Sequence, residues 1–295
     1  MRAADESVAC RICSAATSDA GVVVGRFARR QFHLRRCDAC GYAFIADPVT
    51  DYDTIYSAEY YAGFGADPLV DYTGEVEYPS ETIRVYEWRG LVKAVDALVP
   101  LSRRTRWLDF GCGTGGLVRY CRQLAGADAL GFERGEAARL AREAGTPLIG
   151  MSQLEEAKGT FDVVTAIEVL EHLIDPIAEL AQIRRLLSQG GLFLYTTGNA
   201  EPHRDHLDRW RYVTPEIHVS FFEPRTLSLA LRKTGFVPEF PGFLPGFEDV
   251  IRFKILKNLG RKRRSHFEAL VPWGIVSRLV DRRLGIMRHP IGWGQ

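Results

Sequence analysis

The sequence predicts an α/β protein with a doubly wound, mostly parallel sheet, a small N-terminal module and a basic helical C-terminal tail. Apolar runs alternate with amphipathic segments from residue 104 to about 240, as in folds where helices connect parallel strands. Two CxxC pairs lie within residues 1–47. Residues 251–295 contain eleven Lys/Arg and two Asp/Glu, a balance of +9, so the remaining 250 residues of this +1 chain carry −8.

We expect four segments: a cysteine module at 1–47, a tyrosine-rich lid or linker with a helix at 48–100, the α/β core at 101–250, and a basic amphipathic tail at 251–295. The chain has 295 residues, of which 46% are hydrophobic and 25% charged, values typical of globular proteins. It has no apolar run of about 18 residues, and its first ten residues lack the apolar centre of a signal peptide. We therefore expect a cytoplasmic protein, in which cysteines bind metal or stay reduced.

The core elements follow in order along the chain. Short apolar, often β-branched runs predict the strands, and apolar residues at helical spacing predict the helices. The expected strands are WLDF (107–110), ALGFE (129–133), PLIG (147–150), FDVVTAI (161–167) and LFLYTT (192–197). The expected helices cover residues 115–124, 135–145, 172–188 and 223–236.

A glycine-rich loop follows the first core strand. Gly111, Gly113 and Gly116 match GxGxxG, and Glu133 lies about 20 residues further on, so the loop also fits a dinucleotide and an NAD-type oxidoreductase. Asp109, however, precedes the first glycine by two residues, and its carboxylate would repel a pyrophosphate. It suits a ligand with an ammonium or a sulfonium group. S-adenosylmethionine carries both, with ribose hydroxyls that Glu133 can bind.

Three motifs in this order resemble the class I S-adenosylmethionine-dependent methyltransferases. They are LDFGCGTG (108–115), GFE (131–133) and FDVVTAIEVLEHLIDP (161–176), the last being similar to the subgroup of ubiquinone-pathway and sugar methyltransferases. The resemblance covers residues 104 to about 240. It implies a Rossmann-like core and methyl transfer to oxygen or carbon of a small molecule, such as a sugar or glycan precursor. A non-catalytic, membrane-associated module that binds the cofactor is a further alternative.

The resemblance also implies a set of cofactor-binding residues. The loop would line the methionine end, Glu133 the ribose and GMSQL (150–154) the adenine, although the family often has an Asp near that last place. Tyr56, Tyr60 and Tyr61 would belong to a lid over the cofactor, or would pack the N-terminal module onto the core. The expected cofactor-binding residues are Asp109, Gly111, Cys112, Gly113, Glu133, Met151, Ser152, Leu154 and Tyr60. The alternative is that the glycines only form a tight turn.

Transfer to a hydroxyl needs a base with a pKa near neutrality, which histidine provides. His218, in PEIHVSFFEP, is the first candidate, and its alternative role is that of a surface loop residue. His172 and Glu171 end EVLEH and are the other catalytic candidates. With Glu168 they would share a helical face if a helix has begun there, and some relatives bind Mg²⁺ through this motif. We favour a structural role for EVLEH over a Mg²⁺ site.

Cys10, Cys13, Cys37 and Cys40 form two CxxC pairs separated by 23 residues. Two such pairs complete a tetrahedral zinc site, and four protein ligands leave no open position, so the zinc would be structural. Free thiols or a redox site are the alternative. Sugar C-methyltransferases have a similar N-terminal module, which implies that it helps to wall the acceptor pocket. We expect no sequence-specific contact with nucleic acid.

The basic tail allows three interpretations. Basic amphipathic segments suit anionic membrane surfaces, which would give a peripheral membrane contact. They also steer phosphorylated or lipid-linked acceptors toward a site. The third interpretation is a solvated helix packed against the acidic body of the chain.

Overall fold

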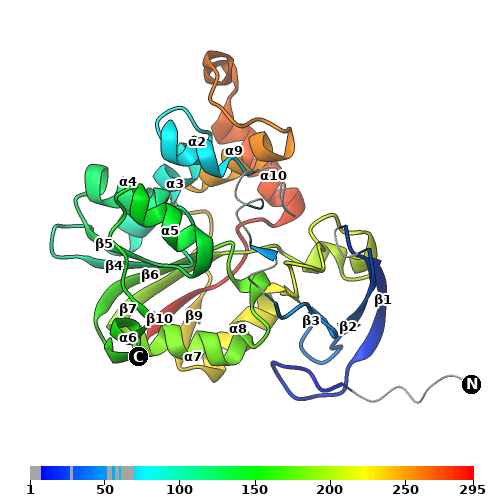
Figure 1. Ribbon diagram of the computed structural model, residues 1–295. Helices are drawn as coiled ribbons and strands as arrows, with labels where there is room; N and C mark the ends of the chain where they lie inside the picture. Colours follow the sequence, from blue (N-terminus) through cyan, green and yellow to red (C-terminus); the bar gives the residue numbers. More distant parts are fainter. Residues whose placement is uncertain (1–7, 27–28, 52–54, 57–59, 61–69) are drawn as a thin grey trace, which may run out of the picture.

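The computed structural model describes residues 8–26, 29–51, 55–56, 60 and 70–295. At its centre is a six-stranded sheet in the order β5-β4-β6-β7-β10-β9 (Figure 1). The neighbouring strands β5, β4, β6 and β7 run parallel to one another, and β10 runs antiparallel to both β7 and β9. The strands are β4 (Arg106–Phe110), β5 (Asp128–Phe132), β6 (Phe161–Ile167), β7 (Leu187–Thr196), β9 (Phe236–Glu239) and β10 (Ile291–Gly294).

Helices cover both faces of this sheet, so the expected doubly wound α/β class is confirmed (Figure 1). Neighbouring strand residues pack into opposite clusters: Leu108 and Phe193 on one side, Trp107 and Leu192 on the other. This alternation is the period of two of a β-strand. The helices of the core are α3 (Arg84–Leu98), α4 (Gly116–Tyr120) with its π-helical continuation η2 (Cys121–Ala125), α5 (Gly135–Glu143), α6 (Met151–Glu156), α7 (Pro176–Leu186) and α8 (Pro224–Lys233).

The chain enters the sheet at β4, moves outward to β5 and then crosses back to β6 on the other side of β4. This reversal of direction creates a crevice at the carboxyl ends of β4 and β6, where open α/β sheets bind ligands. The third expected strand is reduced to one bridge between Leu148 and Gly131. The expected helix at 172–188 begins only at Pro176, because Asp175 caps it and accepts a hydrogen bond from Ala178 N at 3.1 Å.

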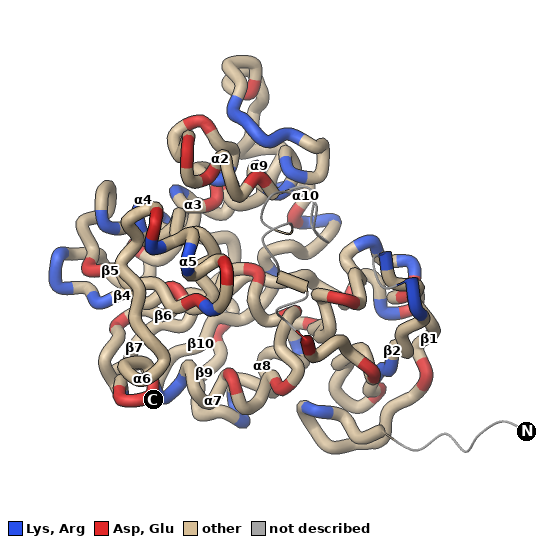
Figure 2. The backbone as a smooth tube through the Cα atoms, in the orientation of Figure 1, with Lys and Arg blue, Asp and Glu red and all other residues tan. Residues whose placement is uncertain are grey.

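The basic C-terminal residues are joined to the core. Helix α9 (Phe247–Asn258) packs on α3, with Val250 beside Trp88 in the core, and β10 lies inside the sheet. The sheet thus includes residues from beyond the expected core boundary at residue 250. Between these two elements lie the 3-10 helix η6 (His266–Leu270) and α10 (Trp273–Leu284), beside a run of Lys and Arg (Figure 2). No helix of the described residues has the length and apolarity needed to cross a membrane.

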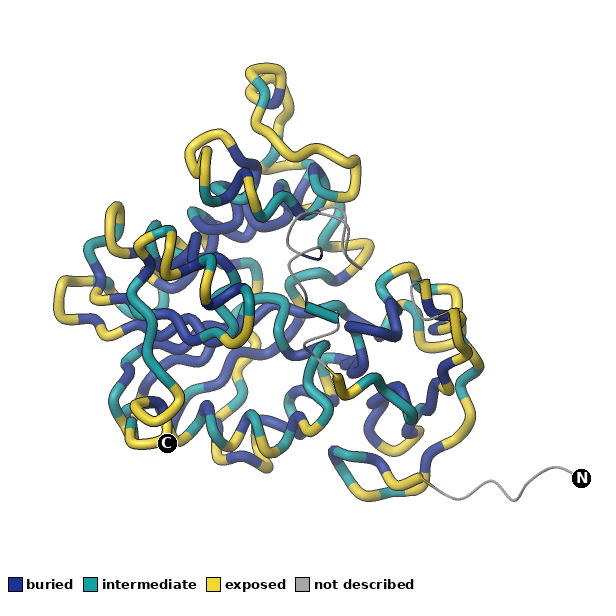
Figure 3. Tube along the Cα trace, viewed as in Figure 1, coloured by how far each residue is buried: buried dark blue, intermediate teal, exposed yellow. Residues whose placement is uncertain are grey.

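The N-terminal module shares a sheet with the core. Strands β1 (Ser18–Val24), β2 (Gln31–Arg36) and β3 (Ala43–Ile45) form an antiparallel sheet whose fourth strand is β8 (Ser220–Phe221). β8 follows the loop after β7, which contains the short turns η4 (Glu201–His203) and η5 (Leu207–Arg209). Buried residues of the two parts, among them Leu34 of β2 and Phe221 of β8, belong to one apolar cluster. Buried stretches of the chain are dark blue in Figure 3. The module therefore holds the loop that carries His218.

Candidate active site

A cavity of about 1250 Å³ opens at the carboxyl ends of β4, β5 and β6. The glycine loop after β4 forms one wall, and residues of α2 (Tyr72–Glu77) and α3 form another. His172, His218 and Tyr212 also line it. The structure thus brings the expected cofactor loop and both candidate bases to one cavity. The expected site residues that line it are Tyr60, Asp109, Gly111, Cys112, Gly113, Glu133, Glu171, His172 and His218.

The glycines of the loop serve different purposes. Gly111 and Gly113 have φ angles of +76° and +54°, a region that residues with a side chain rarely adopt. A Cβ at Gly116 would overlap the ring of Trp88, so this glycine permits close packing between α4 and α3. A Cβ at Gly113 would meet nothing within 4 Å. Gly113 therefore leaves its backbone accessible from the cavity, as a bound ligand requires.

Two carboxyl groups flank this loop, that of the buried Asp109 and that of the half-buried Glu133. Asp109 Oδ1 accepts a hydrogen bond from Thr165 Oγ1 at 2.7 Å, and Glu133 Oε2 accepts one from Gly113 N at 2.8 Å. Burial raises the pKa of Asp109 to about 7, and nearby Glu133 adds to the rise. Burial likewise raises the pKa of Glu133. A cation placed between them would restore the charged forms, so the electrostatics favour a positively charged ligand.

Tyr60 is buried and belongs to a cluster of rings at the edge of the cavity. Its ring centroid lies 5.1 Å from that of Tyr56 and 5.8 Å from that of Tyr72. The Tyr72 hydroxyl lies 3.4 Å from that of Tyr60. Tyr61 and most of the expected lid lie outside the described residues.

The residues expected near the adenine are placed apart from the cavity. Met151, Ser152 and Leu154 lie on α6 and are not among the described residues that line it. Leu154 is fully buried in the core cluster beneath the sheet. At this end the cavity is lined by Arg134 and Gly135, which follow β5.

The two candidate bases lie side by side, with ring centroids 5.0 Å apart. His218 Nδ1 donates a hydrogen bond to the Tyr212 carbonyl oxygen at 2.5 Å, and His172 Nδ1 donates one to that of Ile217 at 2.8 Å. The carbonyl acceptor fixes the proton on Nδ1 of a neutral His218 ring, whereas His172 Nδ1 also lies 3.0 Å from the Tyr56 hydroxyl. Nε2 of His218 then carries the lone pair that a general base needs.

Glu171 is occupied by structural contacts. Its oxygens accept hydrogen bonds from Tyr212 Oη at 2.6 Å and Thr197 Oγ1 at 2.8 Å, and burial raises its pKa. Glu168 lies before the 3-10 turn η3 (Leu170–His172), with a φ of +55°, so EVLEH does not present one continuous helical face. Lys254 Nζ lies 2.7 Å from Glu168 Oε1.

Burial alone would raise the pKa of Glu168, but the charge and hydrogen bond of Lys254, the charge of Lys257 and the hydrogen bond of Thr196 together lower it to about 2. A possible ligand cluster remains among Glu171, His172 and His218, whose candidate atoms lie within 4.8 Å of one another. Mg²⁺ requires oxygen ligands, and both Glu171 oxygens already accept hydrogen bonds. The donor set therefore gives no support to Mg²⁺.

Sequence reasoning missed a charged network opposite the glycine loop. Arg84 forms ion pairs with Glu75, at 3.1 Å, and with Glu87. Thr114 Oγ1, from the glycine loop, donates to Glu75 Oε2 at 3.1 Å. All four residues line the cavity. Glu75, Arg84 and Glu87 lie on helices without a recognisable motif, so only their burial marks them.

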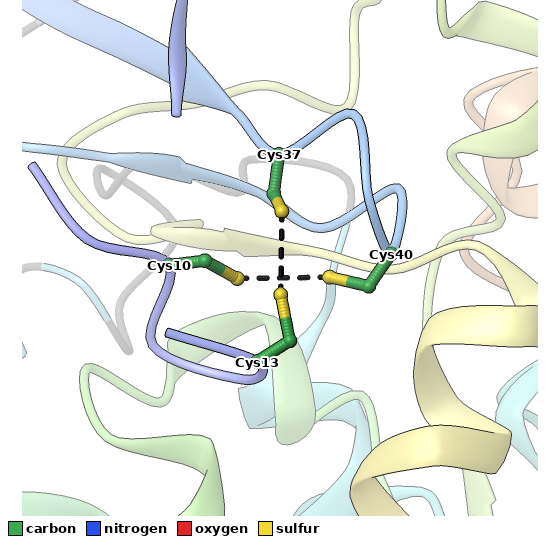
Figure 4. A group of neighbouring side chains, drawn as sticks. All are labelled: Cys10, Cys13, Cys37 and Cys40. Carbon is green, nitrogen blue, oxygen red and sulfur yellow. Dashed lines mark hydrogen bonds between the residues drawn. The ribbon is translucent and has the colours of Figure 1, made fainter. Parts of the chain in front are cut away.

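The four cysteine sulfurs of the N-terminal module point toward a common centre (Figure 4). Cys10 Sγ and Cys40 Sγ lie 3.6 Å apart, and Cys13 Sγ and Cys37 Sγ 3.4 Å apart. These distances exceed that of a disulfide bond, about 2.05 Å. They are close to about 3.8 Å, the distance between two sulfur atoms in a tetrahedral site with four Zn–S bonds of about 2.3 Å. The cluster is thus suited to a zinc ion.

Comparison with known proteins places the core in one family. A family model described as a methyltransferase domain matches residues 82–239. The chain is 33% identical over 147 residues to a ubiquinone biosynthesis O-methyltransferase of Methylococcus capsulatus, covering 43% of this chain and 62% of the relative. It is 37% identical over 116 residues to the Paracidovorax citrulli protein of that name, covering 36% and 48%. The chain spans about half the length of these curated relatives.

A solved structure, a SAM-dependent methyltransferase from Archaeoglobus fulgidus, is also similar. Its identity is 19% and its TM-score 0.41, with 70% of this chain and 94% of that chain covered. The names of the curated relatives give no support to the expected sugar or glycan acceptor. The family match covers the glycine loop and both candidate bases, and favours a methyl donor over the alternative NAD. The chain belongs to the family of proteins with a methyltransferase domain.

Proposed function

We propose that this chain transfers a methyl group from S-adenosylmethionine to a hydroxyl oxygen of a small-molecule acceptor. The observation that carries the proposal is the single cavity lined by both the acidic glycine loop and the histidine pair. A donor bound at the loop and a hydroxyl beside the histidines would share that cavity. The curated relatives named as O-methyltransferases support oxygen as the acceptor atom.

The residues around the loop would bind the cofactor. Asp109 would attract its positive end, and Glu133 would bind the ribose hydroxyls in place of its hydrogen bond to Gly113 N. Tyr60 would close the methionine end. S-adenosylmethionine supplies an electrophilic methyl group on a sulfonium, so the protein has mainly to align donor and acceptor.

His218 would act as the general base, with His172 as the second candidate. In the reaction a bond forms between the acceptor oxygen and the methyl carbon, the carbon–sulfur bond breaks, and the hydroxyl proton passes to the base. The hydrogen bond from His218 Nδ1 to Tyr212 presents Nε2 as the proton acceptor. Glu171 would act indirectly, since its hydrogen bond fixes Tyr212.

The acceptor itself would carry an anionic group. Arg26, from the N-terminal module, and Arg211 line the cavity and are exposed. Lys257, at the end of α9, lines it as well. A phosphorylated or lipid-linked hydroxyl compound would satisfy these cations while its hydroxyl reaches the histidines.

The cysteine cluster would hold one structural zinc ion. All four sulfurs would serve as ligands, leaving no position for water or substrate. Elemental analysis of the purified chain should then give about one zinc per chain, and serine at Cys37 should abolish it. A purified chain that contains no zinc, or a Cys37→Ser variant that retains it, would contradict this assignment.

Isothermal titration provides the direct test of the cofactor. S-adenosylmethionine should bind at micromolar concentration, and NAD should give no heat. Labelled methyl groups should then appear on a hydroxyl compound in a panel of phenols and phosphorylated alcohols. Tight binding of NAD, or methylation confined to nitrogen or carbon, would overturn the proposal.

A further inference from the structure

A protruding surface of the C-terminal region exposes large apolar side chains. Residues 266–272 form a tip that projects away from the sheet, the uppermost orange turn in Figure 1. Phe267 and Leu270 are 80% and 81% exposed there, and Ile275 and Leu279 of α10 are 63% and 62% exposed. Together with Val271 they form what we call the apolar tip. The tip is exposed along most of its length (Figure 3).

Local structure fixes these side chains outward. Ser265 and Glu268 form a capping box at the start of η6. The Glu268 side chain is buried, accepts a hydrogen bond from Tyr86 Oη at 2.7 Å and forms an ion pair with Arg252 at 3.0 Å. Trp273 Nε1 donates to the Glu268 carbonyl oxygen at 2.7 Å. Because Glu268 and Trp273 anchor the turn, the exposed apolar side chains between them are held in place rather than left to collapse onto the body.

Positive charge surrounds the tip. The exposed run Arg261–Arg264 precedes η6, and Arg278, Arg282 and Arg283 are exposed on α10 (Figure 2). On α10, Ile275, Leu279 and Arg282 recur at three- and four-residue spacing, so they share a face. The two acids of residues 259–284 are Glu268, which is buried, and Asp281, which accepts a hydrogen bond from Met287 N at 2.7 Å.

We propose that the apolar tip and its flanking cations dock this chain on an anionic membrane surface. A convex tip with aliphatic and aromatic side chains can enter the headgroup region, while the flanking Lys and Arg side chains bind anionic headgroups. A second copy of the chain is a poorer occupant, since it would bring two basic runs together. Charge complementarity thus selects an anionic lipid surface.

Docking would place the candidate active site close to the membrane. Lys257 and Asn258 line the cavity, and the basic run begins three residues later at Arg261. Most of the surface lies beyond residues 82–239, which the family model matches. The inference does not depend on the proposed methyl transfer, and its test needs no acceptor.

Co-sedimentation of the full chain with vesicles tests the proposal. Retention should be strong on phosphatidylcholine–phosphatidylglycerol vesicles and weak on pure phosphatidylcholine, and should fall with salt. The variant F267S/L270S/I275S should bind about a hundredfold more weakly, because apolar insertion is lost. The variant R261Q/K262Q should bind about tenfold more weakly.

Matched variants control for the chemistry of each change. Leu124→Ser alters an equally exposed leucine (70%) on η2, and R103Q/R104Q removes two exposed cations before β4; both should bind like the unmodified chain. Unchanged thermal unfolding would show that all variants fold. Absent retention, retention equal on both lipids, or retention unaffected by the tip variants would overturn the proposal. A dimer in analytical ultracentrifugation that F267S/L270S/I275S converts to a monomer would assign the tip to self-association instead.

Discussion

The Tyr42 hydroxyl lies 2.6 Å from Ser220 Oγ, linking a residue two positions after Cys40 to one two positions after His218. Ser220 Oγ in turn donates to the Leu173 carbonyl oxygen at 2.6 Å, next to His172. β3 and β8 continue this contact as a strand pair, with Ala43 opposite Phe221. The cysteine module and the two candidate bases are therefore connected by a short path of buried hydrogen bonds.

Loss of the zinc ion that we propose for the cysteine cluster should therefore disturb catalysis without blocking the cofactor. Removal by a strong chelator should lower kcat at least about tenfold, while the affinity for S-adenosylhomocysteine changes less than about threefold. Tyr42→Phe removes only the hydroxyl and should lower kcat about fivefold, the cost of roughly one buried hydrogen bond. Steady-state kinetics and calorimetry on the same samples measure both. Equal loss of turnover and cofactor affinity would show that the module supports the whole core instead.

Cofactor affinity should depend on the charge of Asp109. Because its pKa is about 7, a proton competes with a cationic ligand for this carboxylate. The affinity for S-adenosylmethionine should therefore be constant above pH 8 and fall by up to about tenfold per pH unit below pH 7. Asp109→Asn should bind weakly at all pH values and lose this slope, whereas Glu133→Gln should keep it. A pH-independent affinity in the unmodified chain would contradict the assignment.

Replacement of the histidines distinguishes the general base from its neighbour. His218→Ala should lower kcat by about 10²–10⁴-fold with cofactor affinity intact, because a general base contributes that much. His172→Ala should have the smaller effect, through the contact of the two rings. His206→Ala, an exposed histidine of the same loop region, is the matched control and should be neutral. If His172→Ala has the larger effect, the roles are exchanged.

The Glu168–Lys254 ion pair should contribute to stability as a unit. Lys254→Met leaves a carboxylate unpaired in the cavity wall and should lower the free energy of unfolding by about 3 kcal/mol. The double variant Glu168→Gln/Lys254→Met should recover most of this loss. Arg204→Met breaks an exposed pair with Glu201 and should cost less than about 1 kcal/mol. Urea unfolding of these proteins and of the single variant Glu168→Gln tests this, and a loss in the double variant equal to the sum of the two single losses would refute the coupling.

Two glycines of the loop can be compared, because Gly116 permits close packing on Trp88 whereas Gly113 leaves its backbone accessible to a ligand. Gly116→Ala should destabilise the fold by about 3 kcal/mol, since Trp88 has to move. Gly113→Ala should cost only about 1 kcal/mol, for its left-handed backbone, because its Cβ would meet open space. Thermal unfolding measures both. A larger loss at Gly113 than at Gly116 would show that the loop packs differently.

The parallel strands and the cysteine cluster could be predicted because their signals are local. The apolar, β-branched run FDVVTAI predicts a buried strand, and two CxxC pairs predict that four cysteine sulfurs converge. Strand β10 could not be predicted in this way. Its four residues, Ile291–Gly294, include two glycines, and the strand is stabilised by pairing with β7 and β9, which are distant in the sequence. The condition under which Glu168 would share a helical face with Glu171 and His172 is not met, because Glu168 has a φ of +55° and precedes the 3-10 turn η3.

Sequence motifs located the glycine loop and both histidines of the candidate site, but not the charged residues around Arg84 that pack against the loop. The partners of Arg84 lie 9 residues before it and 3 after it, and nothing in residues 75–87 marks the burial that makes these charges matter. Leu154, which was expected near the adenine, lies on the short helix α6 with its side chain in the core cluster, a burial that the motif GMSQL does not indicate.

Strand β10 has a consequence for how the protein is made. Its four residues fill the gap between β7 and β9, so both strands keep an open edge until residue 294 has left the ribosome. Unpaired edges readily add foreign strands. Until then the nascent enzyme would expose strand edges that can pair with other chains, and a frameshift after codon 290 would harm solubility while sparing every residue of the glycine loop.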